Sequence, residues 1–204
     1  MIKLYFPKVS KKISYHTGKL FSKVPISPVG WTLLSIVPAV IGTYFLSQQN
    51  LAAGFILFVI AGLMDLIDGA VARHTGKVTR IGAFLDGVTD RFVEFLMILG
   101  LYLYGIPALH ISGELWLLIL LSAGTFMTSF VRAYADHKKV IFKEELWLMG
   151  GILERPERLI VIYASMLAGL YNPLYMTSAI AFGAILAVVT VFQRIQFVLK
   201  YGDR

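Results

Sequence analysis

Apolar segments of about 20 residues, separated by short polar connectors, are the feature that most constrains the fold of this chain. A helix needs about 20 predominantly apolar residues to cross the hydrocarbon core of a bilayer. The apolar content of 57% and the mean hydropathy of +0.74 exceed those of an ordinary soluble domain. We therefore expect an all-α integral membrane protein with six transmembrane helices, at about residues 28–48, 51–73, 80–104, 115–136, 154–170 and 174–198.

The first 24 residues differ from the rest because lysines interrupt their apolar residues at short intervals. This pattern predicts an amphipathic helix that lies in the membrane interface and precedes the spans. A disordered basic tail is the alternative. The chain then divides into an amphipathic juxtamembrane segment, residues 1–24, and a six-helix transmembrane catalytic domain, residues 25–204. No cleavable signal peptide is evident in this segment.

The 19 Lys and Arg residues predict the orientation of the spans. They all lie in or within about three helical turns of the N-terminus, the 74–80 loop, the 137–158 connector or the C-terminus, and none lies in the three opposite loops. We therefore expect a multi-pass protein of the cell membrane with both termini and the active site in the cytoplasm. Because the basic residues follow the topology, the net charge of +7 indicates contact with the lipid bilayer and no nucleic acid partner. The absence of cysteine excludes disulfides and thiolate chemistry.

Four carboxylates lie inside the otherwise apolar stretch from residue 64 to residue 92. Asp65 and Asp68 are three residues apart, and Asp86 and Asp90 are four residues apart, so each pair shares one face of a helix. Two neighbouring helices can therefore direct four carboxylates toward one point, where their repulsion requires cations. Ligation by oxygen alone favours Mg²⁺ or Mn²⁺, and two such ions would balance four carboxylates. Salt bridges with nearby arginines or solvation at the helix ends are the alternative.

Small and basic residues accompany these acids. Gly69 and Ala72 leave little side-chain bulk beside the carboxylates, Gly82 lies one turn before Asp86, and the Arg73 guanidinium suits a phosphate. Close helix packing is the alternative explanation for the small residues. The combination of acidic, small and basic residues predicts a site for a metal-bound diphosphate.

Eight of these residues match the signature D-x2-D-G-x2-A-R-x8-G-x3-D-x3-D, and with it the chain resembles the CDP-alcohol phosphotransferase family. The resemblance implies an enzyme in which an acceptor hydroxyl attacks the lipid-linked phosphorus of a CDP-linked lipid and releases CMP. It also implies a homodimer. It further implies that Asp90 acts as the base as well as a metal ligand. The implied CDP-binding residues are Gly69, Ala72, Arg73 and Gly82, together with Thr32, which matches part of the family's Pro-Asn-x-x-Thr entry to the first span.

Four arginines on three different segments lie near the cytoplasmic ends of apolar sequence, namely Arg132, Arg155, Arg158 and Arg194. Together they would form a pocket for an acceptor that carries its own phosphate, a phosphorylated polyol. Snorkelling to lipid headgroups is the alternative for each of them. Their sequence contexts resemble those of phosphatidylinositol-phosphate and archaetidylinositol-phosphate synthases, which implies inositol 1-phosphate as the acceptor.

Other functions stay open at this point. Within the same enzyme class, one alternative is glycerol 3-phosphate as the acceptor, as in phosphatidylglycerol-phosphate synthases. The other is synthesis of a soluble inositol phosphodiester. From another class, the four Asp residues would line the path of a divalent-cation transporter, although such a path places acids near mid-membrane or on both sides. A catalytically silent membrane scaffold leaves the costly acids unexplained.

Overall fold

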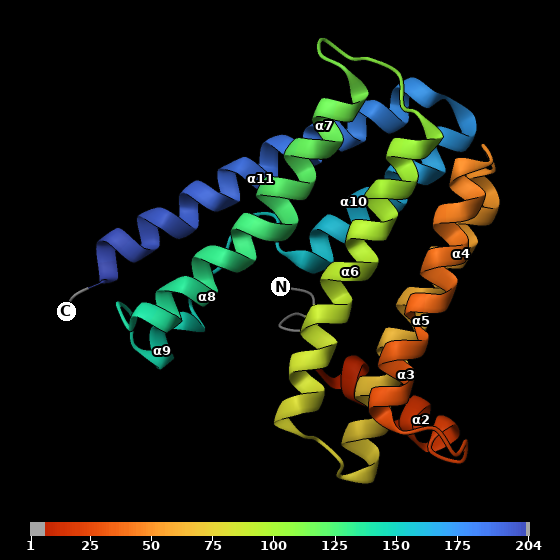
Figure 1. Ribbon diagram of the computed structural model, residues 1–204. Helices are drawn as coiled ribbons and strands as arrows, with labels where there is room; N and C mark the ends of the chain where they lie inside the picture. The colour runs from red at the N-terminus through yellow and green to blue at the C-terminus, as the bar shows by residue number, and fades with distance from the viewer. Residues whose placement is uncertain (1–6, 203–204) are drawn as a thin grey trace.

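The computed structural model describes residues 7–202, and this part of the chain is all-helical (Figure 1). Only an isolated bridge between Leu109 and Ile111 departs from helix, turn and loop in the described range. The predicted all-α class is confirmed. The helices are α2 (Pro7–Phe21), α3 (Pro28–Leu34), α4 (Ile36–Ser47), α5 (Leu51–Thr75), α6 (Arg80–Tyr104), α7 (Gly113–Ile119), the π-helix η1 (Leu120–Met127), α8 (Thr128–Lys138), α9 (Lys143–Leu146), α10 (Arg155–Tyr171) and α11 (Pro173–Tyr201).

Four helical segments of the described range are long and apolar enough to cross a membrane: Pro28–Ser47, Leu51–Thr75, Gly113–Lys138 and Pro173–Tyr201. The two other predicted spans correspond to α6 and α10. The 25-residue α6 is about 37 Å long at a rise of 1.5 Å per residue, but it carries the charged residues of the signature. The α10 helix has only 17 residues. Of the predicted amphipathic segment, α2 is a helix, and residues 1–6 lie outside the described residues.

Short capping sequences set the ends of the two helices that carry the signature. Asn50 accepts a hydrogen bond from the backbone N–H of Ala53 at the start of α5, and Gly76, at φ 66°, ends that helix in the left-handed conformation. Thr79 accepts from the N–H of Gly82 at the start of α6. A loop of four residues therefore joins the helices, which places both halves of the signature at the same end of the molecule.

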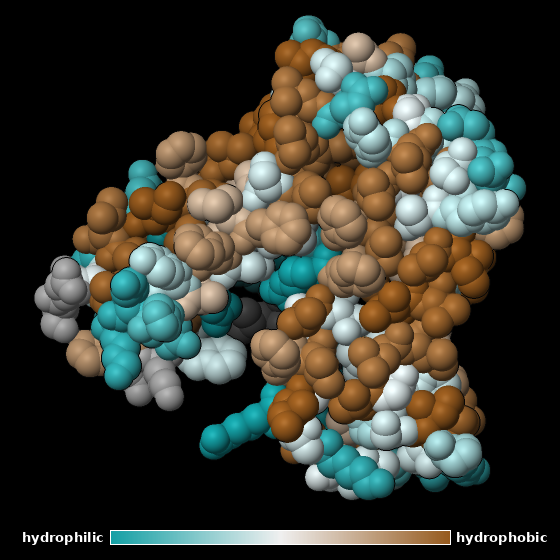
Figure 2. All heavy atoms as spheres, in the orientation of Figure 1, coloured by the Kyte–Doolittle hydropathy of each residue, from teal (hydrophilic) through white to brown (hydrophobic). Residues whose placement is uncertain are grey.

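The helices form two groups that diverge toward one end (Figure 1). In the first group α4 packs against both α5 and α6, and α2 and α3 pack against α5. In the second group α11 packs against α10, α7, η1 and α8. Figure 1 shows the lower part of α6 separated from α8 and α9, and the space-filling view in Figure 2 shows a hollow at that place, with hydrophilic side chains inside it.

The first group of helices packs closely around Leu46, which has no exposed surface. Its side chain lies between a glycine of α5 and a glycine of α6. A Cβ atom added to Gly54 would lie 2.6 Å from Leu46 Cδ2, and one added to Gly100 would lie 2.6 Å from Leu46 Cδ1. Both helices therefore approach α4 at distances that only glycine permits. Because Leu46 is enclosed on both sides, its side chain cannot move away from an added methyl group.

We expect Gly54→Ala and Gly100→Ala to destabilise the protein, because overpacking a filled core costs about 1–3 kcal/mol. Gly87→Ala is the matched control, since a Cβ atom there meets nothing within 4 Å and alanine is favoured over glycine in a helix by about 1 kcal/mol. The midpoint of thermal unfolding in detergent should fall for the first two variants and stay level or rise for the third. Equal midpoints for all three variants would contradict this packing.

Candidate active site

The ends of α5 and α6 that face the loop bring three carboxylates together. The carboxylate oxygens of Asp65, Asp68 and Asp86 lie within 4.8 Å of one another, and Asp68 is buried. Three converging carboxylates with no nitrogen or sulfur donor among them fit a hard divalent cation such as Mg²⁺ or Mn²⁺. The two helices therefore direct these three acids to one point, as their spacing predicted, and their role as metal ligands stays a prediction.

The fourth acid, Asp90, is held by two arginines and also forms a side-chain hydrogen bond with Asp65 of this group. Only 7% of Asp90 is exposed. Its Oδ1 atom lies 2.5 Å from Arg155 Nη2, and its Oδ2 atom lies 3.6 Å from Arg91 Nη1. The same Arg155 also lies 3.8 Å from Asp65 through its Nη1 atom. Arg155 therefore bridges the group of three carboxylates and Asp90.

Thr32, predicted to contact the nucleotide, lies at the acid group. Its hydroxyl is within 2.5 Å of Asp68 Oδ2, and it is also 3.2 Å from the carbonyl oxygen of Pro28 one turn earlier on α3. Because the threonine is buried and α3 packs against α5, this contact fixes one oxygen of Asp68. The residue is therefore placed to orient a metal ligand.

Of the small and basic residues of the signature, Arg73 reaches α2. Arg73 donates hydrogen bonds from Nε and Nη2 to Ser14 Oγ at 3.1 and 2.9 Å. A Cβ atom on Gly69 would lie 3.1 Å from Arg73 Nη1, so glycine leaves room for this guanidinium. At Gly82 a Cβ atom would lie 2.9 Å from Oγ1 of the capping residue Thr79. No sequence signal identified Ser14, because the contact joins residues 59 positions apart.

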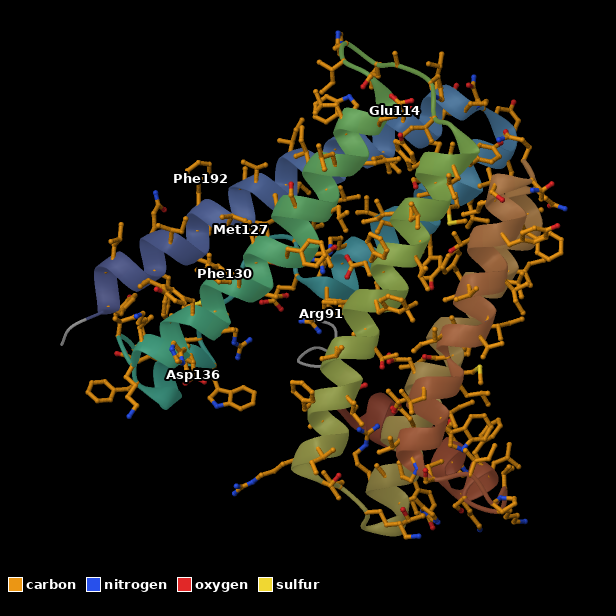
Figure 3. All side chains as sticks on the ribbon, in the orientation of Figure 1. Arg91, Glu114, Met127, Phe130, Asp136 and Phe192 are labelled. Atoms are coloured by element: carbon orange, nitrogen blue, oxygen red, sulfur yellow. The ribbon has the colours of Figure 1, made fainter. Side chains whose placement is uncertain are left out.

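A pocket of about 740 Å³ opens beside the acids, between α6, α8, α10, α11 and the connector before α10. All four arginines that the sequence predicted for a phosphate pocket line it, together with Arg91, which the prediction omitted. The lining contains two carboxylates, Asp136 and Glu154, against five arginines. Figure 3 shows Arg91 on α6 and Asp136 on α8 on either side of the opening. Arg91 follows Asp90 directly in the sequence, so its position next to a predicted site residue could have identified it.

The arginines differ in how they are held. Arg158, with 2% of its surface exposed, forms a bidentate ion pair with the fully buried Glu94 through Nε and Nη2. Arg194 donates from Nη1 to the carbonyl oxygen of Thr128 at 2.5 Å. Arg132 is the most loosely held of the three, with its guanidinium carbon 5.8 Å from the ring centre of the exposed Trp147. Arg158 is therefore the most constrained of the predicted phosphate ligands, because Glu94 engages two of its nitrogens and leaves Nη1 outside the ion pair.

Comparison with known proteins agrees with this arrangement. A sequence profile of the CDP-alcohol phosphatidyltransferase family matches residues 26–193. The archaetidylinositol phosphate synthase of Pyrococcus horikoshii is 31% identical over 93% of this chain and 92% of its own length. The archaetidylinositol phosphate synthase of Methanothermobacter thermautotrophicus is 35% identical over 82% of this chain and 80% of its own length.

Solved structures show the same similarity. The crystal structure of Mycobacterium tuberculosis phosphatidylinositol phosphate synthase with CDP-DAG bound matches with a TM-score of 0.78 and 26% identity, over 94% of this chain and 96% of that one. The complex of the same protein with manganese and citrate also has a TM-score of 0.78. The resemblance inferred from the signature is thus confirmed, and the chain belongs to the CDP-alcohol phosphatidyltransferase family.

Proposed function

We propose that this enzyme transfers the phosphatidyl-type group of a CDP-linked lipid to inositol 1-phosphate and releases CMP. The observation that carries the proposal is the position of Arg155, which contacts Asp90 and also lines the arginine pocket. An acceptor whose phosphate occupies that pocket would present its hydroxyl beside Asp90. Relatives named for inositol phosphate products, and a similar structure with CDP-DAG bound, support both halves of the reaction.

The CDP-lipid half of the site is assigned to the signature residues. Asp65, Asp68 and Asp86 would hold divalent cations, Mg²⁺ or Mn²⁺, with two ions as the sequence-based expectation. Bound there, the metal would neutralise charge on the diphosphate and on the leaving CMP. The guanidinium of Arg73 lies over Gly69, next to the small residue Ala72, and suits a phosphate of the nucleotide. A manganese complex of the similar mycobacterial structure supports the choice of metal.

The acceptor half of the site is assigned to Asp90 and the arginine pocket. In the proposed step the acceptor hydroxyl oxygen bonds to the lipid-linked phosphorus, and the bond from that phosphorus to the oxygen of CMP breaks. The hydroxyl proton passes to a carboxylate oxygen of Asp90. We propose that Asp90 acts as the base rather than as a metal ligand, since Arg155 engages its Oδ1 atom and Arg91 lies 3.6 Å from its Oδ2 atom.

The membrane arrangement is part of the proposal. We place α6 and α10 as spans beside the four apolar ones, because α6 packs along α4 and α10 packs along α11. Six spans put both termini on the cytoplasmic side, together with the signature and the arginines. In this arrangement residues 1–24 lie on the membrane surface and residues 25–204 form the catalytic domain. The homodimer implied by the family resemblance stays a prediction.

The acceptor is tested by supplying purified protein with Mg²⁺, CDP-lipid and one acceptor at a time while CMP release is measured. We expect release with inositol 1-phosphate and none with unphosphorylated inositol, because the arginine pocket requires a phosphate. Release with glycerol 3-phosphate or serine, but not with inositol 1-phosphate, would overturn the acceptor assignment.

The division of labour among the acids is tested with Asp90→Asn and Asp86→Asn. Asp90→Asn should lower kcat by about 10²–10⁴-fold, the usual contribution of a general base, and leave Mn²⁺ binding nearly unchanged. Asp86→Asn should weaken Mn²⁺ binding itself, as measured by the electron paramagnetic resonance signal of free Mn²⁺. An equal loss of Mn²⁺ binding in both variants would restore Asp90 to the metal ligands.

The role of Thr32 is tested with Thr32→Val, which keeps the side-chain shape and removes the hydroxyl that reaches Asp68. We expect the affinity for Mn²⁺ to fall by about 10–100-fold, as for loss of an outer-shell contact. Thr75→Val is the matched control on α5, because the Thr75 hydroxyl bonds only to its own helix at Val71. A rise in the KM for CDP-lipid at saturating metal, with metal affinity unchanged, would favour the nucleotide contact predicted from sequence.

A further inference from the structure

A π-helical segment interrupts the span between Gly113 and Lys138. Residues Leu120–Met127 form η1, and at its end the backbone N–H of Thr128 bonds to the carbonyl oxygen of Ala123, five residues earlier. Each residue of an α-helix turns the chain by about 100°, so a π-helical turn changes which side chains of the following helix face its neighbours. This segment lies against α6, α8 and α11, the helices that line the arginine pocket.

Residues just after the π-helical segment contact two of the pocket arginines. Ser129 Oγ accepts hydrogen bonds from Nε and Nη2 of Arg91 at 3.4 and 3.2 Å. The neighbouring Thr128 offers its backbone carbonyl oxygen to Arg194 Nη1 at 2.5 Å. These arginines come from α6 and α11, so one short piece of helix fixes side chains from two other elements.

Residues inside the π-helical segment hold a third arginine through Glu94. The Thr125 hydroxyl donates to Glu94 Oε1 at 2.8 Å, and Glu94 forms the bidentate ion pair with Arg158 of α10. A Cβ atom on Gly124 would lie 2.8 Å from Arg158 Cδ, so glycine makes room for the arginine stem. Thr125 and Glu94 are both fully buried and neither lines the pocket, whereas Arg158 does.

We propose that Glu94, Gly124, Thr125, Thr128 and Ser129 form a positioning layer that directs Arg91, Arg158 and Arg194 toward the phosphate of the acceptor. The inference rests on the proposed function for the existence of that acceptor. Glu94 engages Nε and Nη2 of Arg158, which leaves Nη1 as the nitrogen outside the ion pair. The pair thereby fixes the plane of the guanidinium, and an arginine fixed in advance loses less rotamer entropy when a phosphate binds.

Charge also favours this arrangement. Five arginines that line one pocket repel one another, and a long flexible side chain without a fixed partner would turn away from the others. Buried Glu94 compensates the charge of Arg158 from behind the pocket wall, so that no carboxylate at that position competes with an incoming phosphate. The Thr128 carbonyl and the Ser129 hydroxyl hold their arginines through uncharged groups. Carboxylates lie farther away, Asp90 at 3.6 Å from Arg91 and Glu154 at 3.7 Å from Arg194.

The test compares Thr125→Val and Ser129→Ala with Ser122→Ala. Ser122 is the matched control because it lies in the same π-helical segment and its hydroxyl bonds only to the preceding turn, at Leu118 and Ile119. For the first two variants we expect the KM for inositol 1-phosphate to rise about tenfold, equivalent to about 1.4 kcal/mol. The KM for CDP-lipid and the Mn²⁺ affinity should stay within about twofold of wild type. All values should be unchanged in Ser122→Ala.

A double-mutant cycle separates a role of Glu94 in positioning Arg158 from a general contribution to stability. If Glu94 acts through Arg158, Glu94→Gln should raise the KM for inositol 1-phosphate in the wild-type background and add little to Arg158→Gln. Gly54→Ala, which disturbs packing far from the pocket, serves as a destabilised control whose KM should not change. A lower unfolding midpoint with an unchanged acceptor KM, or fully additive effects, would overturn the proposal.

Inorganic phosphate as an inhibitor distinguishes this inference from the proposed function. If inositol 1-phosphate is no substrate of the wild-type enzyme, the acceptor assignment fails, but the positioning layer still predicts weaker inhibition by phosphate in Thr125→Val and Ser129→Ala than in Ser122→Ala. Equal inhibition constants in the three variants would contradict the positioning layer whichever acceptor is used.

Discussion

The contact between Arg155 and Asp90 joins two groups of charges that the rest of the structure keeps in place. On one side lie the carboxylates of α5 and α6, and on the other lie arginines from α6, α8, α10 and α11. Neither group is stable alone in a chain this apolar, because an unpaired charge in a low-dielectric surrounding is costly. Placed side by side, each group reduces the cost of the other, and the boundary between them is where the reacting atoms would meet.

The two groups of helices hold the two groups of charges. The helices α4, α5 and α6 pack tightly around a glycine-lined core and hold the acids, whereas α10 and α11 with the π-containing span hold the arginines. The buried pair of Glu94 and Arg158 crosses from the first group to the second. A buried ion pair contributes little net stability relative to apolar packing, but breaking one partner is costly, so such a pair fixes how the groups meet.

Sequence reasoning reached the parts of the site that depend on spacing along one helix. The intervals between Asp65 and Asp68, and between Asp86 and Asp90, placed each pair on one face, and a short loop between two spans brought the faces together. The arginines near the predicted cytoplasmic ends of the later helices were found because the predicted topology alone placed them together. Periodicity and charge distribution are local properties, and they were sufficient for these assignments.

The parts that sequence reasoning missed depend on contacts between distant segments. Nothing in the local sequence shows that the Thr32 hydroxyl reaches Asp68, that Glu94 faces Arg158, or that α7 continues into a π-helix, since each follows from how whole helices pack. The contact of Asp90 with Arg155 has the same origin, because the arginine comes from another helix. Family resemblance supplied roles for these residues without showing which partner each one has.

The hydrogen bonds from Arg73 to Ser14 have a practical consequence for work with this enzyme. They tie α2 to Arg73 at the end of α5, and Gly18 of α2 packs directly on the backbone of α5 at Ala70. Although the sequence predicts a division at residue 24, these contacts join the two sides of it, so removal of residues 1–24 would remove them. A shortened or bulkily tagged amino end would keep the whole eight-residue signature and still deprive its arginine of a fixed neighbour.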